Sequence, residues 1–62
     1  MADQPVHILL HTDPGGGYTI WAIYAHYQVA IAHIPGHVGL ELVRKVARVF
    51  AVSYGMVEVK ED

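Results

Sequence analysis

Two apolar segments joined by a glycine-rich turn occupy the first half of the chain. Residues 6–12 and 18–25 are rich in β-branched and aromatic side chains, which suit a pleated and buried surface. Between them, Pro14 presets φ for a turn, and the glycines that follow it accept the positive φ of a tight reversal. The pattern predicts a β-hairpin in which Thr12 pairs with Tyr18, Leu10 with Ile20, Ile8 with Ala22 and Val6 with Tyr24.

Two more strands are predicted outside the hairpin. The apolar run 29–34 is entered through a turn or bend at residues 25–28 and ends at Pro35-Gly36, a pair that favours a turn. Residues 56–60 alternate between apolar and charged side chains, as in a half-buried strand at the edge of a sheet.

An amphipathic helix is predicted over residues 38–54, where the apolar spacing changes from a period of about 2 to a period of about 3.6. Gly55 is placed to end the helix in a left-handed conformation. The apolar face is expected to hold Leu42, Val43, Val46, Val49, Phe50 and Tyr54, and the opposite face Glu41, Arg44, Lys45 and Arg48. Val52 falls on the charged face and does not fit this division.

The element order β-β-β-α-β predicts one small α+β domain over residues 1–62. The first three strands form antiparallel hairpins, and a right-handed helical crossover returns the fourth strand parallel to the first. The expected sheet order is therefore 3-2-1-4. A single helix covers only one face of such a sheet, and the sequence does not say which face that is.

Both faces of the predicted sheet are apolar, so the face without the helix needs a cover. One face is expected to carry Val6, Ile8, Leu10, Tyr18, Ile20, Ala22, Tyr24, Val29, Ile31 and His33, and the other His7, Leu9, His11, Thr19, Trp21, Ile23, Ala30, Ala32 and Ile34. Soluble monomers rarely expose an apolar patch of this size, and the uncharged strand 29–34 would leave an open edge. We therefore expect a homodimer or a larger oligomer, with a second copy as the cover.

Composition narrows the class of protein. The chain has 62 residues and no cysteine, which excludes a disulfide framework and a thiolate zinc site. Apolar residues reach 53% of the sequence and the mean hydropathy is +0.30, which is high for so short a soluble chain. A chain of this length is near the lower limit for folding without a metal, disulfides or a partner.

Neither a membrane nor a nucleic-acid duplex is an expected partner of the monomer. Histidines, glycines and prolines interrupt the apolar residues, so no run of about 20 lipid-compatible residues is left. The first five residues lack the basic start of a signal peptide, and we expect a cytoplasmic location. The formal net charge of −2 provides no large basic field for phosphates.

Five histidines make up the most unusual feature of the composition, and no metal or other cofactor is expected from their spacing. His7 and His11 share a face of the first strand but lie about 13 Å apart at about 3.3 Å per residue. A metal site would have to be built across an oligomer interface. A candidate ligand site is a polar and aromatic patch on one face of the sheet, formed by His7, His11, Thr19 and Trp21. The same patch could instead form part of a dimer interface.

The sequence gives no argument for catalysis. No carboxylate is placed beside a histidine in a predicted pocket, and Ser53 has no triad partners around it. The glycines at residues 15–17 lead into a strand rather than a helix, so they indicate a hairpin turn and not a phosphate cradle. A candidate contact for a protein or nucleic-acid partner is the basic face of the helix, with Arg44, Lys45 and Arg48.

The segment from Asp13 to Tyr18 and the Ile34-Pro35-Gly36 turn, in a chain with β-β-β-α-β order, resemble the half-RNase-H fold of HicB-type antitoxins. The chain differs from that family in lacking an acidic helix start, a DNA-binding extension and a carboxylate in the first strand. The resemblance implies a similar fold and favours partner binding.

The leading hypothesis is a homo-oligomeric protein that binds another protein through its helix face or a sheet edge. One alternative is a small-molecule or metal-binding oligomer, which could be an enzyme, with a histidine and tryptophan site at the subunit interface. Another is an antitoxin-like or nucleic-acid-associated regulator.

Overall fold

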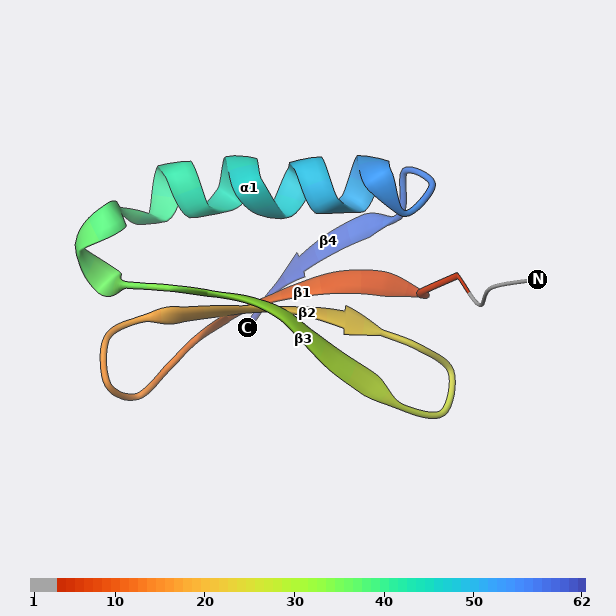
Figure 1. Ribbon diagram of the computed structural model, residues 1–62, viewed down its shortest axis with the longest axis horizontal. Helices are drawn as coiled ribbons and strands as arrows, with labels where there is room; N and C mark the ends of the chain where they lie inside the picture. The colour runs from red at the N-terminus through yellow and green to blue at the C-terminus, as the bar shows by residue number, and fades with distance from the viewer. Residues whose placement is uncertain (1–3) are drawn as a thin grey trace.

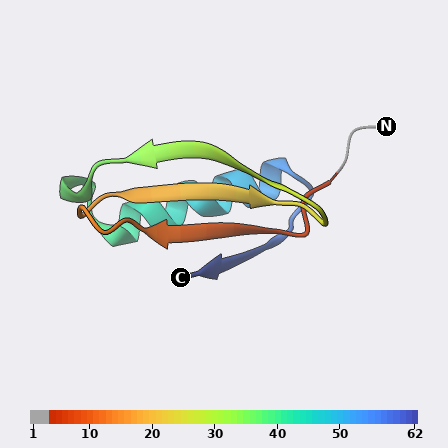
Figure 2. The same cartoon turned by 90° about the horizontal axis from the view of Figure 1, so that it is seen from below.

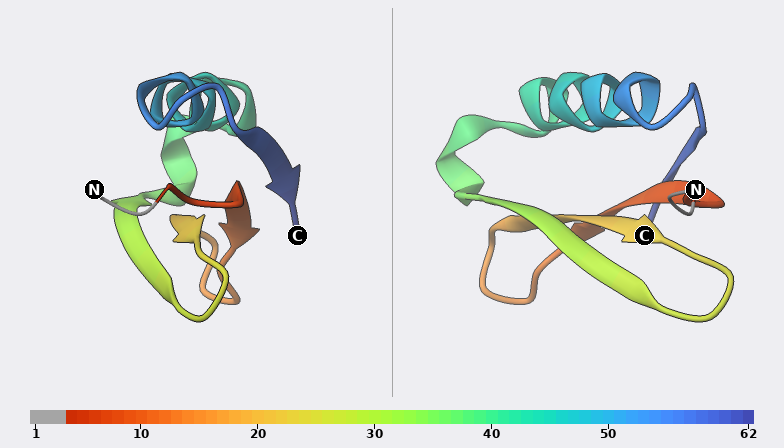
Figure 3. Two further views of the ribbon diagram at one scale, coloured as in Figure 1. Left: turned by 90° about the vertical axis from the view of Figure 1, so that its right-hand side faces the viewer. Right: turned by 45° about the vertical axis from the view of Figure 1, so that its right-hand side comes forward.

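The computed structural model describes residues 4–62. It consists of two layers, a mixed four-stranded sheet and one helix that lies across one face of the sheet (Figure 1, Figure 3). The strands are β1 (His7–Thr12), β2 (Tyr18–Ile23), β3 (Gln28–Ile34) and β4 (Glu58–Glu61), and the helices are the short 3₁₀ turn η1 (Gly36–Val38) and α1 (Leu40–Ser53). Within the described residues, no helix is long and apolar enough to cross a membrane.

The sheet has the predicted order, β3-β2-β1-β4, with β1 antiparallel to β2 and parallel to β4 (Figure 2). Three of the four predicted cross-strand pairs of the hairpin are present, from Thr12↔Tyr18 to Ile8↔Ala22. The fourth predicted pair lies beyond the end of β2, where the Val6 amide donates to the Ile23 carbonyl instead. The β1–β2 loop closes with hydrogen bonds between Asp13 and the glycines of the turn.

The core lies between α1 and the covered face of the sheet. Its fully buried side chains are Ile8, Leu10, Ile20 and Val43. Ala47 and Ala51 complete the buried face of α1, because two small side chains let the helix approach the sheet closely.

The predicted division of the helix was wrong for Leu42 and Val49, whose exposed fractions are 52% and 68%. The buried positions are Val43, Ala47 and Ala51, which lie about one turn apart on the opposite side. The sequence contains two apolar stripes, and only one of them can face the sheet.

A β-bulge in β3 changes the predicted faces of that strand from Ala32 onward. Ile20 pairs with Ala32 and Trp21 pairs with Ala30, so Ile31 is the extra residue. Beyond the bulge, each side chain of β3 lies on the face opposite to the predicted one. His33 lies opposite Thr19 on the uncovered face, whereas Ala32 packs against the core.

The bounds of the last two elements also differ from the prediction. α1 begins at Leu40 because residues 36–38 form a 3₁₀ turn, which packs directly on the β1–β2 loop. A Cβ on Gly36 would collide with the carbonyl oxygen of Gly16. β4 begins at Glu58 because Gly55 and Met56 both adopt positive φ, 101° and 61°.

Candidate functional site

The outer face of α1 carries a second apolar stripe, directed away from the sheet. We define the outer stripe as Leu42, Lys45, Val49 and Val52, which are spaced three and four residues apart along the helix. Its three apolar members are 52%, 68% and 58% exposed. Val52, the residue that did not fit the predicted helix, is therefore part of a continuous surface rather than an isolated exception.

A shallow depression lies along this stripe and is lined by Lys45, Arg48, Val49 and Val52. Two valines form its apolar part and two cations border it. β-branched side chains have little rotamer freedom in a helix, so the shape of this surface is largely fixed before any partner arrives.

The three cations predicted as a contact surface are not equivalent. Arg44 reaches to β4, where its Nε and Nη2 donate to Glu61 at 3.0 and 3.1 Å. These hydrogen bonds, and then the negative charge of Glu61, raise the pKa of Arg44 above its ordinary value. In residues 4–62, neither Lys45 nor Arg48 forms an ion pair. The two cations that line the depression therefore differ from Arg44 in having no ion pair within the described residues.

The four residues of the predicted ligand site all lie on the uncovered face of the sheet. Trp21 pairs with Leu9, His11 pairs with Thr19, and His7 pairs with Ile23 two residues farther along β1. The structure therefore places them on one surface, with His11 and Thr19 side by side and His7 at the far end. β4 adds Glu58 and Lys60 to this face, opposite His7 and Leu9, so the face is more polar than the sequence suggested.

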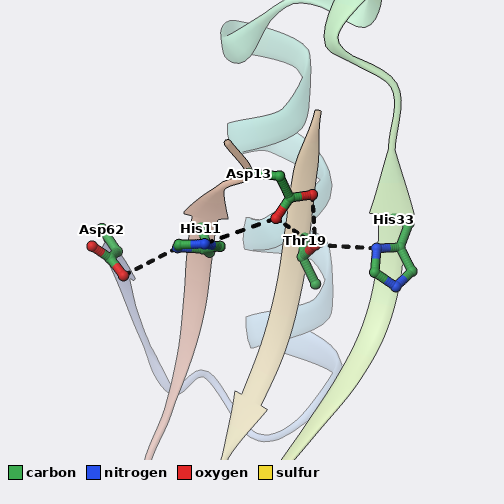
Figure 4. A network of polar contacts seen from close by, with 5 residues as sticks. All are labelled: His11, Asp13, Thr19, His33 and Asp62. Carbon is green, nitrogen blue, oxygen red and sulfur yellow. Dashed lines mark hydrogen bonds and ion pairs between the residues drawn. The ribbon is translucent and has the colours of Figure 1, made fainter. Parts of the chain in front are cut away.

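A polar network runs from β3 across β2 and β1 to Asp62, the residue after β4, at one end of this face (Figure 4). The Thr19 hydroxyl lies 3.0 and 2.9 Å from the two carboxylate oxygens of Asp13, and 3.1 Å from Nδ1 of His33. On the other side, His11 places Nδ1 3.1 Å from Asp62 and Nε2 3.8 Å from Asp13.

Hydrogen counting fixes the direction of these bonds. A hydroxyl carries one hydrogen and a carboxylate only accepts, so Thr19 donates to Asp13 and accepts from His33. Nδ1 of His33 therefore holds a proton, and its Nε2 belongs to an exposed side chain. Thr19 is only 3% exposed, and within the described residues no buried side-chain polar atom lacks a partner.

Sequence reasoning missed three members of this network: Asp13, His33 and Asp62. They come from a loop, an edge strand and the end of the chain, and no spacing in the sequence connects them. Each of them makes its contact through Thr19 or His11, so part of their hydrogen-bonding capacity is used within the protein. No group of three or more metal-ligating side chains in residues 4–62 is arranged to hold an ion.

Comparisons with known protein families, with curated protein sequences and with solved structures found no match to this chain. The resemblance to HicB-type antitoxins therefore rests on the hairpin and turn residues alone.

Proposed function

We propose that this chain is a protein-interaction module without catalytic activity, which engages another protein through the outer stripe of α1. One observation carries the proposal: α1 has an apolar stripe on each side, and only one of them packs against the sheet. Burying a Val or Leu side chain stabilises a complex by about 1.5–3 kcal/mol, before the costs of association. Three such side chains on one rigid helix are a plausible centre for an interface.

The sheet edges, the other predicted contact surfaces, support binding less well. β4 is a short edge that carries Glu58, Lys60 and Glu61, and charged side chains disfavour edge pairing. β3 is uncharged, but its bulge at Ile31 exchanges the two faces halfway along the strand. A partner strand could match only one half of β3 at a time.

Assembly with a second copy stays a prediction. The uncovered face has an apolar centre of Leu9, Trp21 and Ile23, all of them half-buried without a cover. Native mass spectrometry of the purified chain tests it directly. A dimer that becomes a monomer in Trp21→Ala supports packing on this face, and a monomer in the unmodified chain contradicts it.

A second candidate function is ligand binding at the uncovered face, favoured by the exposed side chain of His33, whose Nδ1 contacts Thr19, and by Trp21 on the same face. A ligand that hydrogen-bonds to Nε2 of His33 and stacks on the indole would suit the surface. Quenching of Trp21 fluorescence, lost in His33→Ala, would support this alternative.

Cross-linking tests the leading proposal. A photo-reactive phenylalanine analogue replaces Val49 on the outer stripe, and in a matched variant it replaces His26, which is exposed in the β2–β3 turn. In cells that produce the chain, we expect a discrete adduct from position 49 that is absent from position 26 and disappears with Val52→Asp. Identical adducts from both positions, or none from position 49, would contradict the proposal.

A further inference from the structure

We propose that the partner of the outer stripe is an acidic amphipathic α-helix. Its apolar side chains would lie on Leu42, Val49 and Val52, and its carboxylates would pair with Lys45 and Arg48. This inference rests on the proposed function, and it adds the chemistry that would recognise the site.

Charge supports an acidic partner. The chain as a whole carries a formal net charge of −2, yet the middle of α1 is locally positive. Glu61 neutralises Arg44 at the edge of the helix, and Glu41, in the first turn, is the one acidic residue of α1. Within residues 4–62, Lys45 and Arg48 form no ion pair, and with Glu41 and Glu61 as the nearby acids the four charges of α1 and Glu61 leave a net positive charge on this face. A neutral or basic partner would have to desolvate two cations without replacing their interactions.

The same charges argue against a second copy on this surface. In a two-fold antiparallel pairing of α1 with itself, Lys45 of one chain would lie beside Val49 of the other. This arrangement brings both copies of Lys45 and Arg48 within about a turn of the axis. Four cations would gather there, and like charges at such spacing repel. Repulsion between these cations therefore disfavours a dimer formed through the outer stripe.

The shape of the stripe favours a helix over an extended segment. From Leu42 to Val52 it spans about 15 Å at about 1.5 Å per residue, or roughly three turns. A partner helix can match this length with its own residues at three- and four-residue spacing. An extended strand gains most from backbone hydrogen bonds, which α1 does not offer because its own backbone groups pair within the helix. The small valine side chains also allow a partner helix to approach closely.

Synthetic peptides can test this recognition with the intact chain. The probe is a fluorescein-labelled 18-residue helix-forming peptide with leucine at a and d positions and glutamate at e and g, and the matched peptide has lysine in place of every glutamate. Fluorescence anisotropy gives the Kd of each. We expect the glutamate peptide to bind at least about ten-fold more tightly, a difference that corresponds to about 1.4 kcal/mol. We expect Val49→Asp to abolish this binding.

Two lysine variants isolate the electrostatic contribution. Lys45→Gln removes a cation from the outer stripe, whereas Lys60→Gln removes one from β4 on the other side of the sheet. We expect the first to weaken the glutamate peptide several-fold and the second to leave its Kd within about two-fold. The double variant Lys45→Glu with Arg48→Glu is expected to reverse the preference toward the lysine peptide.

Other outcomes would overturn the inference in distinguishable ways. Equal affinity for both peptides, abolished by Val49→Asp, would refute the acidic partner but leave the outer stripe as the binding surface. No binding of either peptide, with the cross-link at position 49 still present, would refute the helical partner alone. Binding to vesicles of anionic phosphatidylglycerol that is lost in Lys45→Gln, without peptide binding, would replace the protein partner with a membrane surface.

Discussion

The outer face of α1 and the uncovered face of the sheet are both exposed to solvent, but they differ in how far their side chains interact with other groups of the protein. On the sheet, the polar groups at one end satisfy one another: Thr19 links Asp13 to His33, and His11 lies between two carboxylates. On the helix, the apolar side chains of the outer stripe are more than half exposed, and within the described residues Lys45 and Arg48 form no ion pair. Contacts within the protein account for the polar residues at this end of the sheet face. In the part of the chain that the structure describes, no such contacts account for the exposed apolar residues of the outer stripe.

This difference indicates which surface is the better candidate for function. A polar network that uses its own donors and acceptors stabilises the fold and has less to offer a ligand. An exposed apolar stripe contributes little to the stability of the free chain, so its residues are better explained by a partner.

The two faces of α1 should respond very differently to the same acidic substitution. Ala47→Asp introduces a charge at a fully buried position, with an expected cost of at least about 3 kcal/mol. This is at least about a third of the whole stability of about 3–9 kcal/mol expected for a chain of this size, so circular dichroism should show a strongly lowered urea midpoint or complete unfolding. Val49→Asp should change the free energy of unfolding by no more than about 0.5 kcal/mol. Equal destabilisation would mean that the outer stripe is buried in solution.

Thr19 should contribute stability through its hydroxyl group. Thr19→Val keeps the shape of the side chain but leaves Asp13 and His33 without their shared partner, so we expect a loss of about 1–2 kcal/mol in urea unfolding. Thr19→Ser retains the hydroxyl and serves as the control. In the unmodified chain, nitrogen NMR should show the proton on Nδ1 of His33. An unchanged stability in Thr19→Val would show that the network does not support the fold.

Met56 should carry a local conformational cost that glycine would relieve. Its φ of 61° lies in the left-handed region, and its side chain is 81% exposed. Met56→Gly should stabilise the chain by up to about 1 kcal/mol, because glycine adopts this conformation without strain but loses more entropy on folding. The increase in melting temperature should not exceed about 8 °C. A decrease would indicate that the methionine side chain packs against the protein in solution.

The ion pair between Arg44 and Glu61 should have the smallest effect. Both side chains are nearly half exposed, at 48% and 45%, so water and salt screen their attraction. A double-mutant cycle with Arg44→Ala and Glu61→Ala should give a small coupling energy that vanishes in 1 M salt, where the Debye length is about 3 Å. A large coupling that persists in salt would contradict the exposed geometry of this pair.

Several features of the fold follow from local patterns in the sequence. The glycine-rich turn and the β-branched and aromatic runs on both sides of it predict the hairpin and most of its register, because turn and strand preferences depend on residues close together in the sequence. The change to helical spacing locates α1 to within two residues at its start. The sheet order follows from the strand sequence and the handedness of the crossover.

Other features depend on packing between distant segments. In β3, nearly every residue is apolar, so no alternation specifies its register, and only pairing with β2 decides the bulge at Ile31. In α1, the apolar spacing fits two stripes. The helix buries the one with Ala47 and Ala51, because small side chains allow close contact with the sheet.

Local sequence patterns are therefore enough to predict the strands, the helix, their order and the candidate residues on the sheet face and the helix. Packing between distant segments sets which of those side chains are paired and which are exposed: it neutralises Arg44 with Glu61, joins His33 to Thr19, and turns Leu42, Val49 and Val52 toward solvent. The physical reason is that secondary structure depends on neighbours a few residues apart, whereas burial and charge pairing depend on segments that meet only when the chain is folded.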